Sequence, residues 1–227
     1  MNDSTLFQVI DFDRTIFDTS KFALLVTAEL ETLWPGMGKT LDEQFEVAYK
    51  NRETFFVFRY IREAIGNDAL EELVKTVVDK VGVDALLMAG ARERLAYAET
   101  IGTQQPAWGI LTYGDAEDQY MKLRIAGFKD TPTILLETPD KSEIIATWKN
   151  DDGTFTLPEE FGGHVVTNVS LEDDKLRAFN NIVEGTIGIW MKNELNDLVA
   201  GETIPDGVVT VANMYESIEY LKSLYTA

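Results

Sequence analysis

The chain has 227 residues, of which 45% are hydrophobic, and a formal net charge of −19. This length fits one large domain or a domain with a subdomain, and the acidic balance argues against nucleic acid or an anionic membrane as a partner. Cysteine is absent, which excludes disulfides and thiolate sites, and a single histidine gives little support to a zinc site or a Ser-His-Asp triad.

No targeting signal is visible in the sequence. The first residues, MNDSTLFQ, contain neither a basic region nor an apolar signal core, and no apolar run approaches the length of a membrane span. We therefore expect a cytoplasmic protein without a membrane partner. A small anionic substrate is compatible with the acidic charge if its pocket is locally positive. No pattern indicates the oligomeric state.

Six short apolar runs predict β-strands. They are apolar nearly throughout, as expected for strands buried on both faces of a parallel sheet. These runs are Phe7–Ile10, Trp108–Leu111, Thr133–Leu136, His164–Val166, Thr186–Trp190 and Val208–Val211. From the second run onward, helical patterns alternate with them, at Asp115–Ala126, Asp140–Lys149, Asp173–Asn181 and Asn213–Leu224. This alternation predicts an α/β fold with a doubly wound parallel sheet.

A long stretch between the first and second strands does not follow this alternation. Its patterns predict consecutive helices, at Ser20–Leu33, Thr40–Tyr49, Glu53–Ala64, Asp68–Lys80 and Ala91–Glu99. We therefore predict that residues 1–19 and 101–227 form the α/β core, and that residues 20–100 form an inserted helical subdomain.

Polar side chains follow several of the predicted strands. Ligands bind beyond the carboxyl ends of the strands in a parallel sheet, so these residues are the candidates for a functional site. Asp11 and Asp13 follow the first strand, Thr112 follows the second, and Lys141 opens the helix after the third. Two neighbouring carboxylates repel each other, and a bound cation would compensate. Oxygen ligands of this kind suit Mg²⁺.

The motifs occur in a specific order. The segment "DFDRT", then "ILTYG", then a lysine that opens a helix, then a strand ending in acidic residues resembles the haloacid dehalogenase (HAD) superfamily. The resemblance covers the whole predicted core, which would be Rossmann-like, and the helical insertion resembles the C1-type cap of that superfamily.

The resemblance implies a role for each of these residues. Asp11 would be the nucleophile and Asp13 the general acid and base. Thr112 would hydrogen-bond the phosphoryl oxygens, and Lys141 would offset negative charge. Tyr113 and Gly114, which follow Thr112, would be substrate contacts.

The resemblance also implies a magnesium site. Its ligands would be the Asp11 carboxylate, the Asp13 backbone carbonyl and the fourth motif. Aligning "TNVSLED" with that motif places Asn168 at the usual first acid and Asp173 at the second. The other register places Val169 and Asp174 there. We favour Asn168 because Mg²⁺ needs an oxygen ligand, although an amide lacks the usual charge.

Two further positions bear on the resemblance. Arg14 replaces the glycine that is common in the first motif, at a variable position. Lys122 is a rival to Lys141, but it lies too soon after the second motif. In the insertion, Arg52, Arg59 and Arg62 are candidates to reach a substrate, although a solvated face is the simpler interpretation.

The function implied is that of a Mg²⁺-dependent phosphatase acting on a small phosphorylated metabolite through an aspartyl-phosphate. Asp13 favours phosphoryl transfer, because dehalogenases of the superfamily lack an acid at this position. Three alternatives remain open. Asn168 motivates a non-catalytic binding or regulatory protein, a phosphomutase would share the first steps, and a phosphoacceptor receiver domain is opposed by the long insertion.

Overall fold

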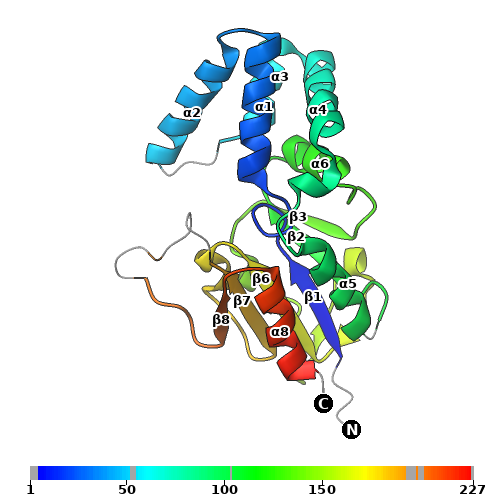
Figure 1. Ribbon diagram of the computed structural model, residues 1–227. Coiled ribbons are helices and arrows are strands. Elements are labelled where there is room, and N and C mark those ends of the chain that lie inside the picture. The colour runs from blue at the N-terminus through cyan, green and yellow to red at the C-terminus, as the bar shows by residue number, and fades with distance from the viewer. Residues whose placement is uncertain (1–4, 52–54, 103, 193–197, 199–201, 226–227) are drawn as a thin grey trace. The chain divides into compact units, whose positions relative to one another are not determined.

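The computed structural model describes residues 5–51, 55–102, 104–192, 198 and 202–225. Its framework is a six-stranded parallel sheet with the order β3-β2-β1-β6-β7-β8 (Figure 1). The strands are β1 (Leu6–Ile10), β2 (Trp108–Tyr113), β3 (Thr133–Leu136), β6 (Asn168–Asp173), β7 (Thr186–Met191) and β8 (Val208–Val211). The predicted α/β fold with a doubly wound parallel sheet is confirmed. The direction of winding reverses between β1 and β6, which is where such sheets bind ligands.

The fourth predicted strand is wrong. Within His164–Val166 only Val165 and Val166 form a strand, β5 (Val165–Val166), which pairs antiparallel with β4 (Phe155–Thr156) in a separate two-stranded sheet. The fourth strand of the main sheet is β6, which begins at Asn168 and continues to Asp173.

The alternating pattern of β6 explains the error. Val169 and Leu171 are buried in the apolar core, whereas Ser170 and Glu172 are equally buried but polar. A buried strand with polar residues on one face does not appear as an apolar run, so no strand was predicted over these residues. The predicted helix Asp173–Asn181 shrinks for the same reason to the short 3₁₀ helix η3 (Leu176–Phe179).

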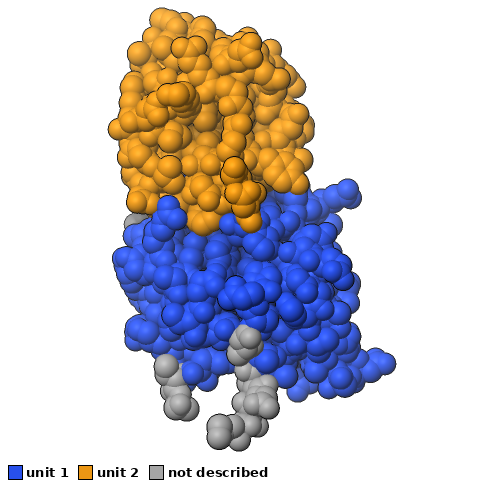
Figure 2. All heavy atoms as spheres, turned by 90° about the vertical axis from the view of Figure 1, so that its right-hand side faces the viewer, with its two compact units in different colours: residues 1–17, 88–113, 131–227 blue, residues 18–87, 114–130 orange. Residues whose placement is uncertain are grey.

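The chain divides into two compact units, which Figure 2 colours separately. Unit 1 comprises residues 1–17, 88–113 and 131–227, and unit 2 comprises residues 18–87 and 114–130. Besides the strands, unit 1 contains α5 (Ala91–Ile101), α7 (Lys141–Ala146), α8 (Met214–Tyr225), η2 (Glu159–Phe161) and η3. Unit 2 contains α1 (Thr19–Leu33), α2 (Met37–Asn51), α3 (Val57–Ile65), α4 (Asn67–Val81), η1 (Val83–Leu86) and α6 (Ala116–Ile125). Residues 52–54, including Arg52 and the start of the predicted helix Glu53–Ala64, lie outside the described residues.

This division differs from the one drawn from the sequence at two helices. Helix α5 falls in unit 1, where it packs beside α8. Helix α6 falls in unit 2, where the carboxylate of Asp118 accepts a hydrogen bond from the Phe58 backbone N–H at 3.3 Å. Arg59 and Arg62 of α3 form ion pairs with Asp115 and Glu117 at the start of α6. The two arginines are therefore engaged within unit 2.

One face of the sheet carries the apolar core of unit 1. Phe7 and Val9 of β1 and Leu171 of β6 point into it, together with Phe161 and Trp148 from the connections. The Phe7 and Phe161 rings lie 5.0 Å apart. Burial of these large side chains is the main stabilisation of the sheet. No helix in the described part of the chain combines the length and the apolar character needed to cross a membrane.

The opposite face carries a buried polar network. Arg94 of α5 donates to Glu172 at 2.9 Å, to Gln8 at 2.8 Å and to the Ser217 hydroxyl at 3.2 Å. The side chains of Arg94 and Glu172 are both 0% exposed. The backbone carbonyl of Glu172 also accepts the Asp11 N–H at 2.8 Å. The network thus ties α5 to the two strand ends that carry the acidic residues.

We expect Arg94→Met to lower the free energy of unfolding by about 3–5 kcal/mol, because it leaves the carboxylate of Glu172 buried without its partner. Urea denaturation followed by circular dichroism measures this loss. The double variant with Glu172→Met should lose less, since both charges are removed. Arg92→Met, at an exposed position of the same helix, is the matched control. An equal loss in the Arg94 and Arg92 variants would contradict the assignment.

The Asp118 carboxyl in unit 2 predicts a pH dependence. Burial raises its pKa to about 6, and the charge of Asp115 adds to this effect. Because the folded state holds this proton more tightly than the unfolded state, the free energy of unfolding falls as pH rises from about 4 to about 6. Above about pH 6 the carboxyl is ionised in both states, and the loss of stability is complete. Asp118→Asn should therefore stabilise the protein by on the order of 1 kcal/mol at pH 7.5 and by less at pH 5. Urea denaturation at pH 7.5 and pH 5 measures this difference, and Asp130→Asn, at an exposed position, is the control. An equal stabilisation by Asp118→Asn at the two pH values would contradict the prediction.

Candidate active site

Asp11 is the central carboxylate of the site. It directly follows β1, its side chain is buried, and its Oδ2 accepts a hydrogen bond from the Thr15 hydroxyl at 3.3 Å. Burial raises the pKa of Asp11 to about 6, although the nearby Lys141 ammonium opposes the shift. Asp11 lies at the carboxyl edge of the sheet, as predicted.

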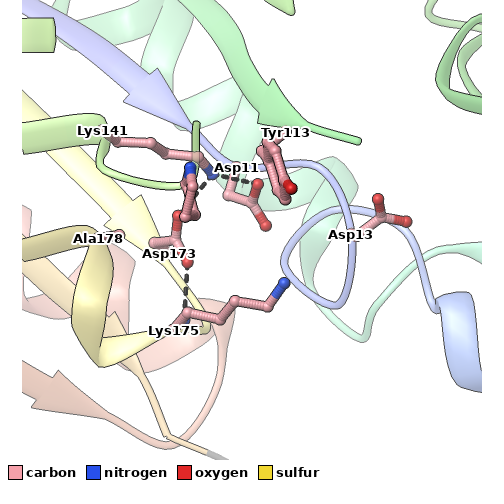
Figure 3. A pocket seen from close by; sticks show the side chains of 8 residues that line it. Asp11, Asp13, Tyr113, Lys141, Asp173, Lys175 and Ala178 are labelled. Atoms are coloured by element: carbon pink, nitrogen blue, oxygen red, sulfur yellow. Dashed lines mark hydrogen bonds and ion pairs between the residues drawn. The ribbon is translucent and has the colours of Figure 1, made fainter. Parts of the chain in front are cut away.

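Lys141 is the cation that holds the site together. It is the first residue of α7, and its ammonium group forms ion pairs with Asp11 and, at 2.5 Å, with Asp173 (Figure 3). Burial would lower the pKa of Lys141, but the charges of the two carboxylates outweigh it and raise the pKa. The structure brings the predicted lysine, and not Lys122, to the predicted aspartate.

The acidic end of β6 supplies two further carboxylates. Asp173 is its last residue, and Asp174 follows; both are buried. One oxygen each from Asp11, Asp173 and Asp174 can be chosen so that the three lie within 4.8 Å of one another. Burial raises the pKa of Asp174 to about 8, with the charge of Asp173 as the next cause.

The placement of Asn168 in this site is wrong. Asn168 is the first residue of β6 and lies opposite Leu6, whereas Asp173 is the last. The two ends of β6 are five residue steps apart along an extended strand, a distance of roughly 17 Å. Val169, which the other register places at the position of the first acid, is also near the starting edge. The structure instead places the adjacent acids Asp173 and Asp174 beside Asp11.

The three carboxylates fit a hard divalent cation. All of their donor atoms are oxygens, and one lysine does not balance three buried acids. The cavity lined by Asp11 and Asp173 has a volume of about 20 Å³, enough for one water-sized particle. Both the donor set and the space are therefore suitable for an ion such as Mg²⁺.

The other predicted site residues lie at the same edge of the sheet. Asp13 and Tyr113 line the cavity, and Figure 3 shows the Asp13 carboxylate directed away from Lys141. Thr112 is the second-last residue of β2, and its buried hydroxyl has no hydrogen-bond partner in the described structure. Gly114, which ends the run, is not among the residues lining this cavity.

Arg14 occupies an unusual backbone conformation in the loop after β1. Its φ is 62°, a left-handed value, and it is the only non-glycine residue of the described chain with positive φ. The loop is closed by a hydrogen bond from the Arg14 N–H to the Phe17 carbonyl at 2.7 Å. This conformation favours glycine and costs an arginine about 1–2 kcal/mol. A glycine at this position would adopt the same conformation without that cost.

The cavity contains a second lysine that the sequence did not single out. Lys175 lines it, and the Lys175 backbone N–H donates to Asp173 at 2.7 Å. The predicted helix over Asp173–Asn181 concealed this position. The adjacent Asp174 appeared only in the register that was not favoured.

Comparison with known proteins identifies the fold. No family model and no curated protein sequence matches the chain. It is similar in structure to a candidate haloacid dehalogenase-like hydrolase from Burkholderia xenovorans, with 15% identity, a TM-score of 0.67 and 99% of both chains covered. A candidate HAD hydrolase from Bacillus subtilis, YfnB, solved bound to magnesium, has 16% identity and a TM-score of 0.56, covering 96% of this chain and 99% of that one.

A third structure adds a different activity among the similar folds. A candidate β-phosphoglucomutase from Thermotoga maritima has 15% identity and a TM-score of 0.51. The similarity covers 97% of this chain and 100% of that one. These similarities show that the chain has the fold of haloacid dehalogenase-like hydrolases, which the motifs predicted.

Proposed function

We propose that this protein is a Mg²⁺-dependent phosphatase that hydrolyses a small phosphorylated metabolite through an aspartyl-phosphate. The observation that carries the proposal is the buried Asp11 carboxylate, ion-paired with Lys141 and next to the acids of β6. A carboxylate held in this way is positioned as a nucleophile, and the lysine offsets the charge that gathers during phosphoryl transfer. The cytoplasm remains the proposed location, on the sequence argument alone.

The first chemical step would take place on Asp11. One of its carboxylate oxygens forms a bond to phosphorus while the bond between phosphorus and the leaving oxygen breaks. Asp13 donates a proton to that oxygen, so the alcohol departs neutral. Thr112 would donate a hydrogen bond to a phosphoryl oxygen. Its buried hydroxyl has no partner in the described structure, which supports this role, because a buried donor without an acceptor is costly.

The second step would restore the enzyme. The Asp13 carboxylate accepts a proton from water as the water oxygen attacks phosphorus. The bond between phosphorus and Asp11 breaks, which releases inorganic phosphate and regenerates both aspartates. Lys141, which forms ion pairs with both Asp11 and Asp173 in the free protein, would hold the two side chains in place.

The residues that would hold Mg²⁺ are Asp11, Asp173 and Asp174, with the Asp13 backbone carbonyl expected from the sequence motif. When bound, the ion would neutralise charge on the carboxylates and on the phosphoryl group. The magnesium bound to the similar Bacillus subtilis protein supports this choice of ion.

Of the alternative functions, the non-catalytic protein loses its support and the phosphomutase keeps it. The argument for a non-catalytic protein came from Asn168, which lies at the other end of β6 and no longer counts against catalysis. A phosphomutase remains an alternative, because a candidate phosphomutase shares the fold. Such an enzyme would pass the phosphoryl group to a second substrate hydroxyl and release little inorganic phosphate.

Phosphate release from a panel of phosphomonoesters tests the proposal. We expect turnover that requires Mg²⁺, is abolished by a chelator, and falls by at least about a thousandfold in Asp11→Asn, since the nucleophile is lost. Circular dichroism confirms that the variant is folded. Release by Asp11→Asn equal to that of the wild type would overturn the mechanism, and phosphoryl transfer between two sugar phosphates without release would favour the mutase.

Magnesium binding is tested separately by thermal unfolding. Ligand binding stabilises the folded state by about 1.4 kcal/mol when free Mg²⁺ reaches ten times its Kd. We expect this stabilisation in the wild type and in Asn168→Asp to be equal, and to be largely absent in Asp174→Asn. A larger shift in Asn168→Asp than in the wild type would return Asn168 to the metal site.

A further inference from the structure

The second lysine of the cavity has no role in the chemistry described so far. Lys175 follows the two acids of β6, and its side chain is exposed while lining the same cavity as Asp11. Figure 3 shows its ammonium group reaching from the end of β6 toward the loop that carries Asp13. Lys175 therefore presents a positive charge at the mouth of the site rather than at its base.

The two lysines differ in how their charges are used. The Lys141 ammonium is buried and paired with Asp11 and Asp173. The Lys175 ammonium forms no ion pair in the described part of the chain, and only its backbone N–H contacts a carboxylate. Because Lys175 is exposed, the general electrostatic benefit of its charge to the carboxylates is small. Its position is better suited to a ligand than to holding the fold together.

The charge of the whole chain favours a local cation where an anionic substrate would bind. At a net charge of −19, the protein repels anions at long range. Arg14, in the loop after β1 that also carries Asp13, has a left-handed backbone. Residues held in such conformations are concentrated at functional sites.

We propose that Lys175 is a specificity-determining residue that binds a second anionic group of the substrate, such as a carboxylate located close to the phosphoryl group. This inference rests on the proposed phosphatase function and names the class of substrate: a phosphomonoester that carries a further negative charge. Lys141 would interact with the phosphoryl group of the substrate, and Lys175 would bind its second anionic group.

A matched pair of synthetic substrates isolates this interaction. Propyl phosphate and 3-phosphooxypropionate have the same chain length, and only the second carries a carboxylate. A charge-assisted hydrogen bond is worth roughly ten- to hundredfold in affinity. We expect the wild type to prefer 3-phosphooxypropionate in kcat/KM by at least about tenfold. Lys175→Met should remove this preference by raising KM for 3-phosphooxypropionate, with kcat nearly unchanged.

Two further variants serve as controls. Lys175→Arg keeps the charge and should retain most of the preference. Lys149→Met makes the same change of charge at a residue that lines a different cavity, which does not include the acids of the site, and it should leave the preference unchanged. An unchanged preference in Lys175→Met, or an equal loss in Lys149→Met, would overturn the inference while leaving the phosphatase proposal in place.

Direct binding separates the two proposals if neither compound is hydrolysed. Calorimetry in the presence of Mg²⁺ then compares the affinity of 3-phosphooxypropionate for the wild type and for Lys175→Met. A loss of about tenfold or more in the variant supports the role of Lys175 even if the phosphatase proposal has failed. Equal affinity, or no binding to either protein, overturns it.

Discussion

The site depends on one buried ammonium group. Lys141 joins Asp11 from the end of β1 to Asp173 from the end of β6, so the first residue of a short helix links two neighbouring strands. Without this cation, the carboxylates would be buried close together with no positive charge between them, which is costly. The parallel pairing of β1 with β6 brings both acids to the same edge, and Lys141 makes their proximity tolerable. The proposed metal would complete the same compensation.

The other face of the sheet supports this edge by a second buried pair. Arg94 forms an ion pair with the Glu172 side chain, and the Glu172 backbone carbonyl accepts a hydrogen bond from the Asp11 N–H. This buried ion pair therefore constrains the backbone that carries the acidic residues. The apolar face needs no such device, because Phe7, Val9 and Leu171 are fixed by close packing. One sheet thus combines an apolar face for stability with a polar face that holds the strand ends.

The sequence was sufficient for the parts of this arrangement that depend on local pattern. Apolar strands followed by Asp11, Thr112 and Lys141 predicted both the sheet and most of the carboxylate edge. The sequence-based prediction failed at β6. Ser170 and Glu172 are buried by segments that are distant in the chain, and no local pattern shows that Arg94 pairs with Glu172. Helix α6 was assigned to the core for the same reason, since its contacts with α3 involve charged pairs between distant segments.

The division of the chain has a consequence for how this protein can diversify. All the residues that line the cavity between Asp11 and Lys175 belong to unit 1, and the chain leaves that unit twice, after Phe17 and after Tyr113. The helices of unit 2 are thus inserted between the segments that line the cavity, and they supply none of its acids or lysines. Changes in the length or sequence of those helices can therefore accumulate without altering the residues that line the cavity.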